Sequence, residues 1–341
     1  MIDFKPSDIY EKITTIDSHT AGEPFRVITS GVPSPEGATI LEKRKYAEQH
    51  LDNFRKILMF EPRGHADMYG CFITEPVTET ADFGVLFIHN EGFSTMCGHG
   101  IIAVTTIAVE TGMVSPDTTG GIIRIDTPAG LVTAMPEIKN KMVKSVSFEN
   151  VASFAPDLNA QVRVPELGTI TYDLGFGGAF YAFVNAEDLG LSCSPEYFSR
   201  LIDCGRRIKN AIMNSRKIIH PFEPDLGFLY GTIFVDRPEN SNVHSRHCCI
   251  FADGEVDRSP TGTGVSARLA VLNAKNQLEP ETCINIASII GTEFKGKIKK
   301  KTRFGGYEAV IPEVTGSAYI TGIHQFLVHP DDPLSKGFIL R

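Results

Sequence analysis

Two short stretches of this chain resemble each other: Met96-Cys97-Gly98-His99-Gly100 and Pro260-Thr261-Gly262-Thr263-Gly264. The glycine spacing is the same in both, and each stretch opens an apolar run of helical character. The sequence therefore predicts two helices that begin alike. Cys97 stands at the start of one helix, and Thr261 stands at the equivalent place in the other.

The separation of the two stretches indicates two related halves. Cys97 and Thr261 lie 164 residues apart, which is about half of the 341 residues. We expect a first α+β half over 1–175 and a second over 176–323. The tail at about 324–341 either follows the second half or returns to the first. Gly175-Phe-Gly-Gly178 is the candidate crossing between the halves, unless it forms a local bulge or turn.

Most of the remaining pattern predicts strands. Short runs rich in β-branched and aromatic residues are bounded by Gly, Pro, Asn and Asp. These runs are 84–89, 121–126, 179–184, 231–236, 248–252 and 307–311. Apart from the motif helices, helical periodicity occurs only at about 41–58 and 195–216. Many strands with few helices between them predict an α+β fold rather than a parallel βαβ sheet.

Composition excludes several classes of partner. Thirty-three basic against 41 acidic residues give a net charge of −8, which argues against nucleic acid. One basic cluster, 295–303, is interpreted as a solvated strand or turn. No apolar stretch has the length of a membrane span or signal region, so a cytoplasmic protein is expected. Seven irregularly spaced cysteines indicate reduced thiols rather than a disulfide framework.

The start of a helix is a natural place to bind a carboxylate, because its first backbone N–H groups are unpaired and its dipole end is positive. Gly98 and His99 on one helix, with Gly262 and Thr263 on the other, are therefore expected to bind one anionic group together. The same field is expected to lower the pKa of Cys97 and make its thiolate a base near neutral pH.

Thr261 cannot act as a base in the same way, because an alcohol is a much weaker acid than a thiol. It can donate or accept a hydrogen bond. Asp257, four residues before Thr261, is a candidate partner for a substrate ammonium group. Together these groups predict a small zwitterionic amino acid as ligand, although a glycine-flanked cysteine at a helix start is also common as a purely structural feature.

Longer motifs carry a resemblance to a known family. MCGHG and DRSPTGTG, with GEPFR at 22–26, EPRGHADMYG at 61–70 and GGAFYA at 177–182, resemble the proline racemase family over nearly the whole chain. Racemases and 4-hydroxyproline epimerases of that family carry a cysteine in both motifs. The pairing of Cys97 with Thr261 instead resembles the family's trans-3-hydroxy-L-proline dehydratase branch, and the bulky apolar residue in GEPFR favours the same branch.

The resemblance implies a fold like that of diaminopimelate epimerase, with two pseudo-symmetric halves, each a curved, mostly antiparallel sheet around a central helix. It assigns the catalytic base to Cys97, with Thr261 facing it, and the substrate nitrogen to Asp257. Carboxylate binding falls on residues of the two helix starts, namely Gly98, His99, Gly262 and Thr263. The family uses no metal, pyridoxal phosphate or nicotinamide, so no cofactor is expected, and a homodimer is common in it.

A single base changes the expected reaction. Racemisation needs an acid and a base on opposite faces of Cα, and Thr261 removes one of them. In trans-3-hydroxy-L-proline the hydroxyl lies on the same ring face as the α-hydrogen. We hypothesise that Cys97 removes the α-proton and also protonates the departing hydroxide, giving an enamine that tautomerises to Δ1-pyrroline-2-carboxylate. The alternatives are a proline racemase or 4-hydroxyproline epimerase, and a catalytically inactive amino-acid-binding protein.

Other polar clusters have simpler interpretations. His65 and Asp67 are spaced like a His–carboxylate pair, but a structural role is favoured, as it is for His19. Cys248 and Cys249, near His244 and His247, are disfavoured as metal ligands because adjacent strand residues point to opposite faces.

Overall fold

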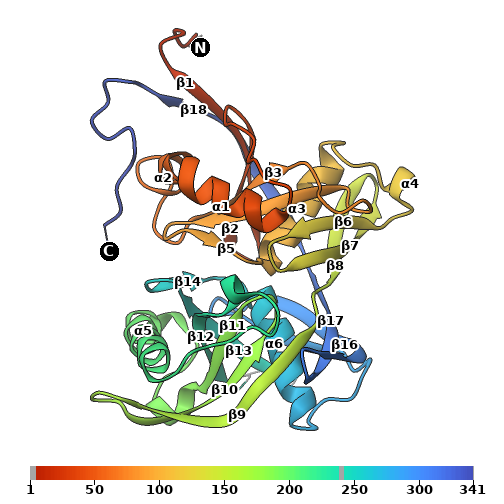
Figure 1. The fold of residues 1–341 in the computed structure, drawn as a ribbon, viewed down its shortest axis with the longest axis vertical. Coiled ribbons are helices and arrows are strands. Elements are labelled where there is room, and N and C mark those ends of the chain that lie inside the picture. Colours follow the sequence, from red (N-terminus) through yellow and green to blue (C-terminus); the bar gives the residue numbers. More distant parts are fainter. Residues whose placement is uncertain (1–4, 238–241, 341) are drawn as a thin grey trace.

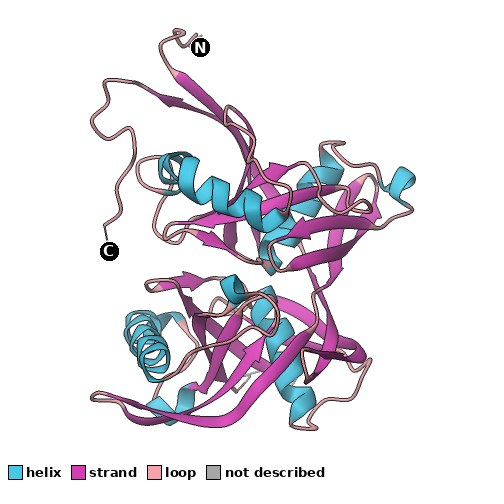
Figure 2. Ribbon diagram, viewed as in Figure 1, coloured by secondary structure: helices cyan, strands magenta, loops and turns pink. Residues whose placement is uncertain are grey.

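Each motif helix lies inside its own curved set of strands (Figures 1 and 2). The computed structural model describes residues 5–237 and 242–340. The central helix of the first half is α3 (Gly98–Glu110), and that of the second half is α6 (Gly262–Ala274). Figure 1 shows the two halves one above the other, with both termini beside the first half.

The first half contains nine strands and three further helices within the described residues. The strands are β1 (Glu11–Thr20), β2 (Glu23–Ser30), β3 (Tyr69–Thr74), β4 (Phe83–His89), β5 (Phe93–Ser94), β6 (Ile123–Thr127), β7 (Gly130–Lys139), β8 (Met142–Glu149) and β18 (Ala318–Val328). The helices are α1 (Ile40–His50), α2 (Asp52–Met59) and α4 (Pro116–Thr119).

The second half is built in the same manner. Its strands are β9 (Ser153–Val164), β10 (Gly168–Phe176), β11 (Phe180–Asn185), β12 (Leu229–Asp236), β13 (Ser245–Phe251), β14 (Glu255–Asp257), β15 (Ile284–Ala287), β16 (Glu293–Phe304) and β17 (Tyr307–Gly316). Its other helix is α5 (Phe198–Ser215), with 3-10 turns η1 (Ala186–Leu189), η2 (Pro195–Tyr197) and η3 (Pro224–Leu226).

The strand pairing repeats from one half to the other. The antiparallel pair β1–β2 is followed by parallel β2–β3, antiparallel β3–β4 and β4–β5, then parallel β4–β6 and antiparallel β6–β7. The run from β10 to β16 has the same sequence of pairings. The predicted α+β class with two pseudo-symmetric, mostly antiparallel halves is therefore confirmed.

Both central helices are buried on every side. In α3 all residues from Gly98 to Ala108 are buried, and in α6 ten of the first eleven residues are. A helix that is apolar all round is stable only where protein covers each face. The strands around it supply that cover, and α1 and α2 in one half and α5 in the other pack on the outside of the sheets.

The change from one half to the other occurs earlier than the predicted boundary at 175. Strands β9 and β10 pair with each other, and both pack against α6, so the second half begins near Ser153. The chain crosses between β8 and β9, and Gly177 and Gly178 form the turn between β10 and β11 instead. A local glycine-rich turn and a crossing look alike in sequence, because both need the same backbone freedom.

The return of the chain to the first half also begins earlier than the tail at 324. β18 pairs with β1 along its whole length, from Ala318 opposite Thr20 to Val328 opposite Glu11.

The predicted helix at 41–58 is two helices, which meet at the non-helical residue Leu51. No helix among the described residues combines the length and apolar character that a bilayer crossing needs.

The two central helices meet start to start. A Cβ atom added to Gly98 would lie 2.5 Å from the Gly262 Cα, and one added to Gly262 would lie 2.7 Å from the Gly98 Cα. Real Cβ atoms do not approach backbone this closely, so neither position accepts a side chain without movement of the halves. Gly98 and Gly262 are therefore required by the contact between the halves.

We predict that Gly98→Ala lowers the free energy of unfolding by about 1–3 kcal/mol, the usual cost of overpacking. Gly92→Ala is the matched control, because a Cβ there would meet no atom within 4 Å. Chemical denaturation of both variants measures the difference. An unchanged stability for Gly98→Ala would contradict the close approach of the helices.

Candidate active site

All seven residues singled out in the sequence line one narrow cavity between the two helix starts. They are Cys97, Gly98, His99, Asp257, Thr261, Gly262 and Thr263. The first half contributes the first three, and the second half contributes the other four. The cavity also has an aromatic wall and a second thiol, formed by Tyr69, Tyr181, Tyr230, Phe251 and Cys249, with Met96 beside them.

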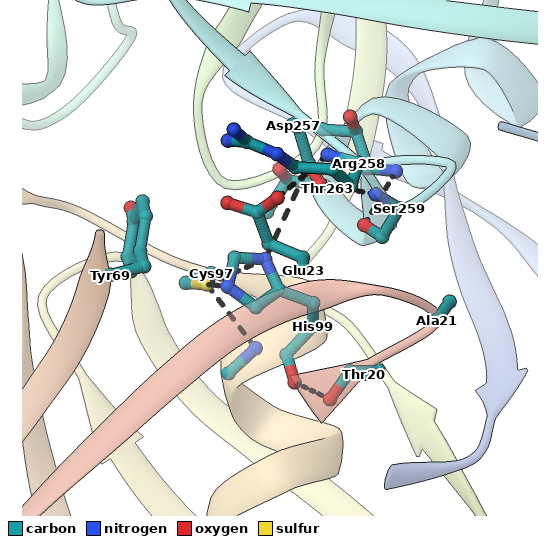
Figure 3. Close-up of polar contacts among 12 residues, drawn as sticks. Thr20, Ala21, Glu23, Tyr69, Cys97, His99, Asp257, Arg258, Ser259 and Thr263 are labelled. Atoms are coloured by element: carbon teal, nitrogen blue, oxygen red, sulfur yellow. Dashed lines mark hydrogen bonds and ion pairs between the residues drawn. The ribbon is translucent and has the colours of Figure 1, made fainter. Parts of the chain in front are cut away.

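Cys97 is the residue before α3, and its side chain turns back onto that helix. The Cys97 Sγ accepts a hydrogen bond from the Gly100 N–H at 3.2 Å and lies 3.3 Å from the His99 Nδ1 (Figure 3). The thiol is 4% exposed. A sulfur that accepts the helix's own N–H is already placed where a negative charge would be stabilised.

Burial nevertheless raises the pKa of Cys97 well above its ordinary value, and this corrects the lowered pKa expected from the sequence. The Gly100 N–H lowers this pKa as expected, but the Asp257 and Glu23 carboxylates raise it further. Loss of water around the sulfur outweighs the effect of the helix start. The resting group is therefore the thiol.

His99 is neutral beside this thiol. Burial lowers the pKa of its imidazole to about 3, although its Nδ1 lies 3.9 Å from the Asp257 Oδ2. The ring stands edge-on to Tyr69 and Phe25, with centroids 4.9 and 5.6 Å away, and the His99 carbonyl accepts a hydrogen bond from the Thr20 hydroxyl at 2.9 Å. These contacts hold the start of α3 in one orientation.

Asp257 ends β14 on the other side of the cavity. One carboxylate oxygen accepts the Ser259 N–H at 2.7 Å, and the side chain is buried. Burial raises its pKa to about 6, with Ser259, Thr261 and Arg258 opposing the rise. The group is thus mostly ionised at neutral pH, and a buried carboxylate of this kind is stabilised by a bound cation such as an ammonium group.

The two helix starts differ at the residue that distinguishes the motifs. Cys97 has an extended backbone with φ −141°, whereas Thr261 has φ +66°, a left-handed conformation unusual for a β-branched residue. The Thr261 side chain makes no capping bond to α6, so it is not committed to its own helix as Cys97 is. The sequence had predicted equivalent starts, and the backbone shows that they are not equivalent.

The two helix starts predicted to bind a carboxylate lie face to face. The first N–H groups of α3 and α6 have no partner within their helices, and the helices face each other at Gly98 and Gly262. Thr263 is fixed beside them by a hydrogen bond of 2.7 Å between its hydroxyl and that of Tyr181. An anion between the helices would meet both positive dipole ends.

Sequence reasoning missed Glu23 and the aromatic wall. Glu23 is fully buried, its Oε2 accepts the Arg258 N–H at 2.6 Å, and burial raises its pKa well above the ordinary value. Glu23 and Tyr69 lie in the GEPFR and EPRGHADMYG motifs, which identified the family without indicating a role for either residue. Cys249 was considered only as a metal ligand.

The minor clusters are mainly structural. Asp67 pairs with Arg258 at 2.9 Å across the two halves, while His65 is exposed, so the two do not form a catalytic pair. The His19 Nδ1 accepts the Gly22 N–H in a turn. Cys248 and Cys249 do face opposite sides of β13, and no metal-binding group of three residues occurs in the part of the chain that the structure describes.

The Proline racemase family model matches residues 15–339. The chain belongs to the proline racemase family. A solved structure with the same fold is that of a hydroxyproline epimerase from Agrobacterium vitis with bound trans-4-hydroxy-L-proline. Its TM-score is 0.91 at 31% identity, and the match covers 98% of this chain and 96% of that one.

Curated relatives in the proline racemase family bear two kinds of name. Trans-3-hydroxy-L-proline dehydratase of Colwellia psychrerythraea is 49% identical over 97% of this chain and 94% of its own length. A Burkholderia multivorans protein named 3-hydroxyproline 2-epimerase is 43% identical over 98% of this chain and 99% of its own length. The name dehydratase recurs among several other relatives at 42–48% identity.

The raised pKa of Cys97 predicts slow alkylation at neutral pH. Iodoacetamide reacts with the thiolate, so labelling of Cys97 should accelerate as pH rises above 8, because deprotonation of the buried thiol is costly. Cys283 is an exposed internal control and should label fast at pH 7. Peptide mass spectrometry at several pH values measures both, and faster labelling of Cys97 than of Cys283 at pH 7 would contradict the burial argument.

Proposed function

We propose that this member of the proline racemase family catalyses the cofactor-independent dehydration of trans-3-hydroxy-L-proline to Δ1-pyrroline-2-carboxylate, with Cys97 as the α-proton base. The observation that carries the proposal is the unequal pair of helix starts. Cys97 points its sulfur into the cavity on one side, and Thr261, on a left-handed backbone, stands at the other. The names of the dehydratase relatives support the same reaction.

The cavity suits a small zwitterionic amino acid. The carboxylate of the substrate lies between the two helix starts, at the N–H groups of Gly98, His99, Gly262 and Thr263. The ring ammonium pairs with Asp257, which is mostly ionised at neutral pH. Placing both charges fixes Cα between the two walls, so that the α-hydrogen faces one of them. Charge that develops next to the carboxylate during proton removal is stabilised by the two dipoles.

Binding of the substrate also activates the thiol. Asp257 is one of the carboxylates that raise the pKa of Cys97. A substrate ammonium paired with Asp257 cancels that negative charge. The Gly100 N–H then favours the thiolate, and the thiol proton passes to solvent as the substrate enters. The base is therefore formed in the presence of the group it acts upon, and a resting thiol is compatible with catalysis.

Epimerisation at Cα is the second candidate, because Cys249 gives the Thr261 side of the cavity a thiol after all. The name of the Burkholderia multivorans relative agrees with this alternative. Dehydration is favoured because Cys249 comes from β13 rather than from a helix start, whereas the Cys97 sulfur accepts the Gly100 N–H of α3. The homodimer and the cytoplasmic location expected earlier stay predictions.

The direct test is to incubate the protein separately with trans-3-hydroxy-L-proline, trans-4-hydroxy-L-proline and L-proline. Trapping the imine with o-aminobenzaldehyde should show product from the first compound alone. Cys97→Ser should lower the rate by about 10²–10⁴-fold, the usual contribution of a positioned base. Cys249→Ser is the matched control for loss of a buried thiol. Inversion of proline or 4-hydroxyproline by the wild type, or full activity of Cys97→Ser, would overturn the proposal.

Thr261→Cys should add a second acid–base group opposite Cys97. We expect this variant to exchange and invert the α-hydrogen of L-proline, which the wild type should not invert. Chiral chromatography with deuterium uptake from D₂O measures both events. Thr261→Ser is the control, since it keeps the hydroxyl without a thiol, and inversion by that variant at the same rate would contradict the role assigned to the thiol.

A further inference from the structure

The aromatic wall of the cavity contains a hydroxyl group on the same half of the molecule as Cys97. Tyr69 begins β3, is buried, and lies beside Cys97 and His99 (Figure 3). Its hydroxyl donates a hydrogen bond to the Ser94 Oγ at 2.5 Å and lies 2.9 Å from the Tyr230 hydroxyl of the second half. Tyr69 is therefore a cavity residue whose polar atom is held by two neighbours.

In the proposed orientation of the substrate, its ring carbons lie against the aromatic wall of the cavity. With the carboxylate at the helix starts and the nitrogen at Asp257, the ring atom on the other side of Cα is C3. The remaining lining is the aromatic wall with Cys249 and Met96. The 3-hydroxyl of the trans isomer is on the face of the α-hydrogen, which is the face toward Cys97. A group that contacts this hydroxyl must come from the same side.

Few donors meet that condition among the described cavity residues. The Tyr181 and Thr263 hydroxyls bond each other, and both belong to the second half, as does Thr261. Tyr230 also comes from the second half, and its hydroxyl is a hydrogen-bond partner of the Tyr69 hydroxyl at 2.9 Å. Of the lining residues contributed by the first half, Tyr69 is the one with a hydroxyl group. The His99 ring, which is neutral, is near the sulfur rather than at the aromatic wall.

We propose that Tyr69 is the acid that protonates the departing 3-hydroxyl group, with Ser94 and Tyr230 holding its phenol in place. This inference rests on the proposed dehydration and changes one part of it. Cys97 then serves only as the base for the α-proton, rather than as base and acid in turn. Tyr69 is a catalytic residue in this scheme because its oxygen contacts the leaving group.

Protons and electrons balance in this step. The Cys97 thiolate takes the proton from Cα, the C–H pair forms the C2=C3 double bond, and the C3–O bond breaks. The Tyr69 O–H proton moves to the departing oxygen, so water leaves together with the enamine. The site then holds a thiol and a tyrosinate, and transfer of the Cys97 proton to Tyr69 restores the starting state.

The hydrogen bonds around Tyr69 suit this cycle. Its O–H donates to the Ser94 Oγ, and rotation of the O–H aims the proton at the substrate. Ser94 and Tyr230 can then donate to the phenolic oxygen as it becomes negative. Burial raises the pKa of Tyr69 well above its ordinary value, so the phenol keeps its proton until a base as strong as hydroxide develops.

Tyr69→Phe tests the inference, because it removes only the hydroxyl. We expect dehydration of trans-3-hydroxy-L-proline to fall at least about 100-fold, the lower range for loss of a general acid. Exchange of the α-hydrogen with D₂O in recovered substrate should persist, since Cys97 is intact. Elimination of fluoride from trans-3-fluoro-L-proline should fall less than about threefold, because fluoride is a much weaker base than hydroxide and leaves without the acid.

The ratio of fluoride to water elimination in one sample does not depend on the fraction of folded protein, so it stays informative if Tyr69→Phe is destabilised. Tyr172→Phe, a buried tyrosine of β10 outside the cavity lining, is the matched control and should leave the ratio unchanged. Equal loss for both substrates, or loss of exchange together with elimination, would overturn the role of Tyr69. A wild type that does not dehydrate the hydroxy substrate would instead refute the proposed function itself.

Discussion

The starts of the two central helices approach each other too closely for side chains to lie between them. Gly98 and Gly262 bring the backbones of α3 and α6 together with no room for a Cβ atom. Both helices must then be buried in the middle of the molecule, and each needs a sheet wrapped around it. The same contact places unpaired N–H groups, a sulfur and a hydroxyl at one point, so packing and chemistry have a common origin.

Two opposing effects set the ionisation of the acidic groups in the cavity, namely burial and the positive dipole ends of the two helices. The starts favour negative charge, while burial disfavours it at Cys97, Asp257 and Glu23 alike. Three acidic groups in one dry region also repel one another when ionised. A ligand that carries a cation and an anion relieves both problems at once, which explains why a zwitterion suits the cavity better than a simple anion or cation.

Much of the architecture could be predicted from the sequence because the decisive motifs are local. The glycine pattern after Cys97 and Thr261 located both central helices, and the motif residues do converge on one cavity. The boundary at 175 and the start of the returning strand could not be predicted, because β9, β10 and β18 are assigned to a half only by their long-range pairing. The pKa of Cys97 and the backbone of Thr261 depend on surroundings assembled from both halves, which no local pattern contains.

The strand β17 couples the unfolding of the two halves. It pairs with β16 and β9 in the second half and with β8 in the first, and α3 and α6 share one apolar core that includes Val104 and Val265. Around α3 and α6 the two halves share one sheet and one core, while a further apolar cluster lies within each half. The two halves have similar topologies but are not independently stable. We expect them to unfold in a single thermal transition, with no folded half-molecule at equilibrium.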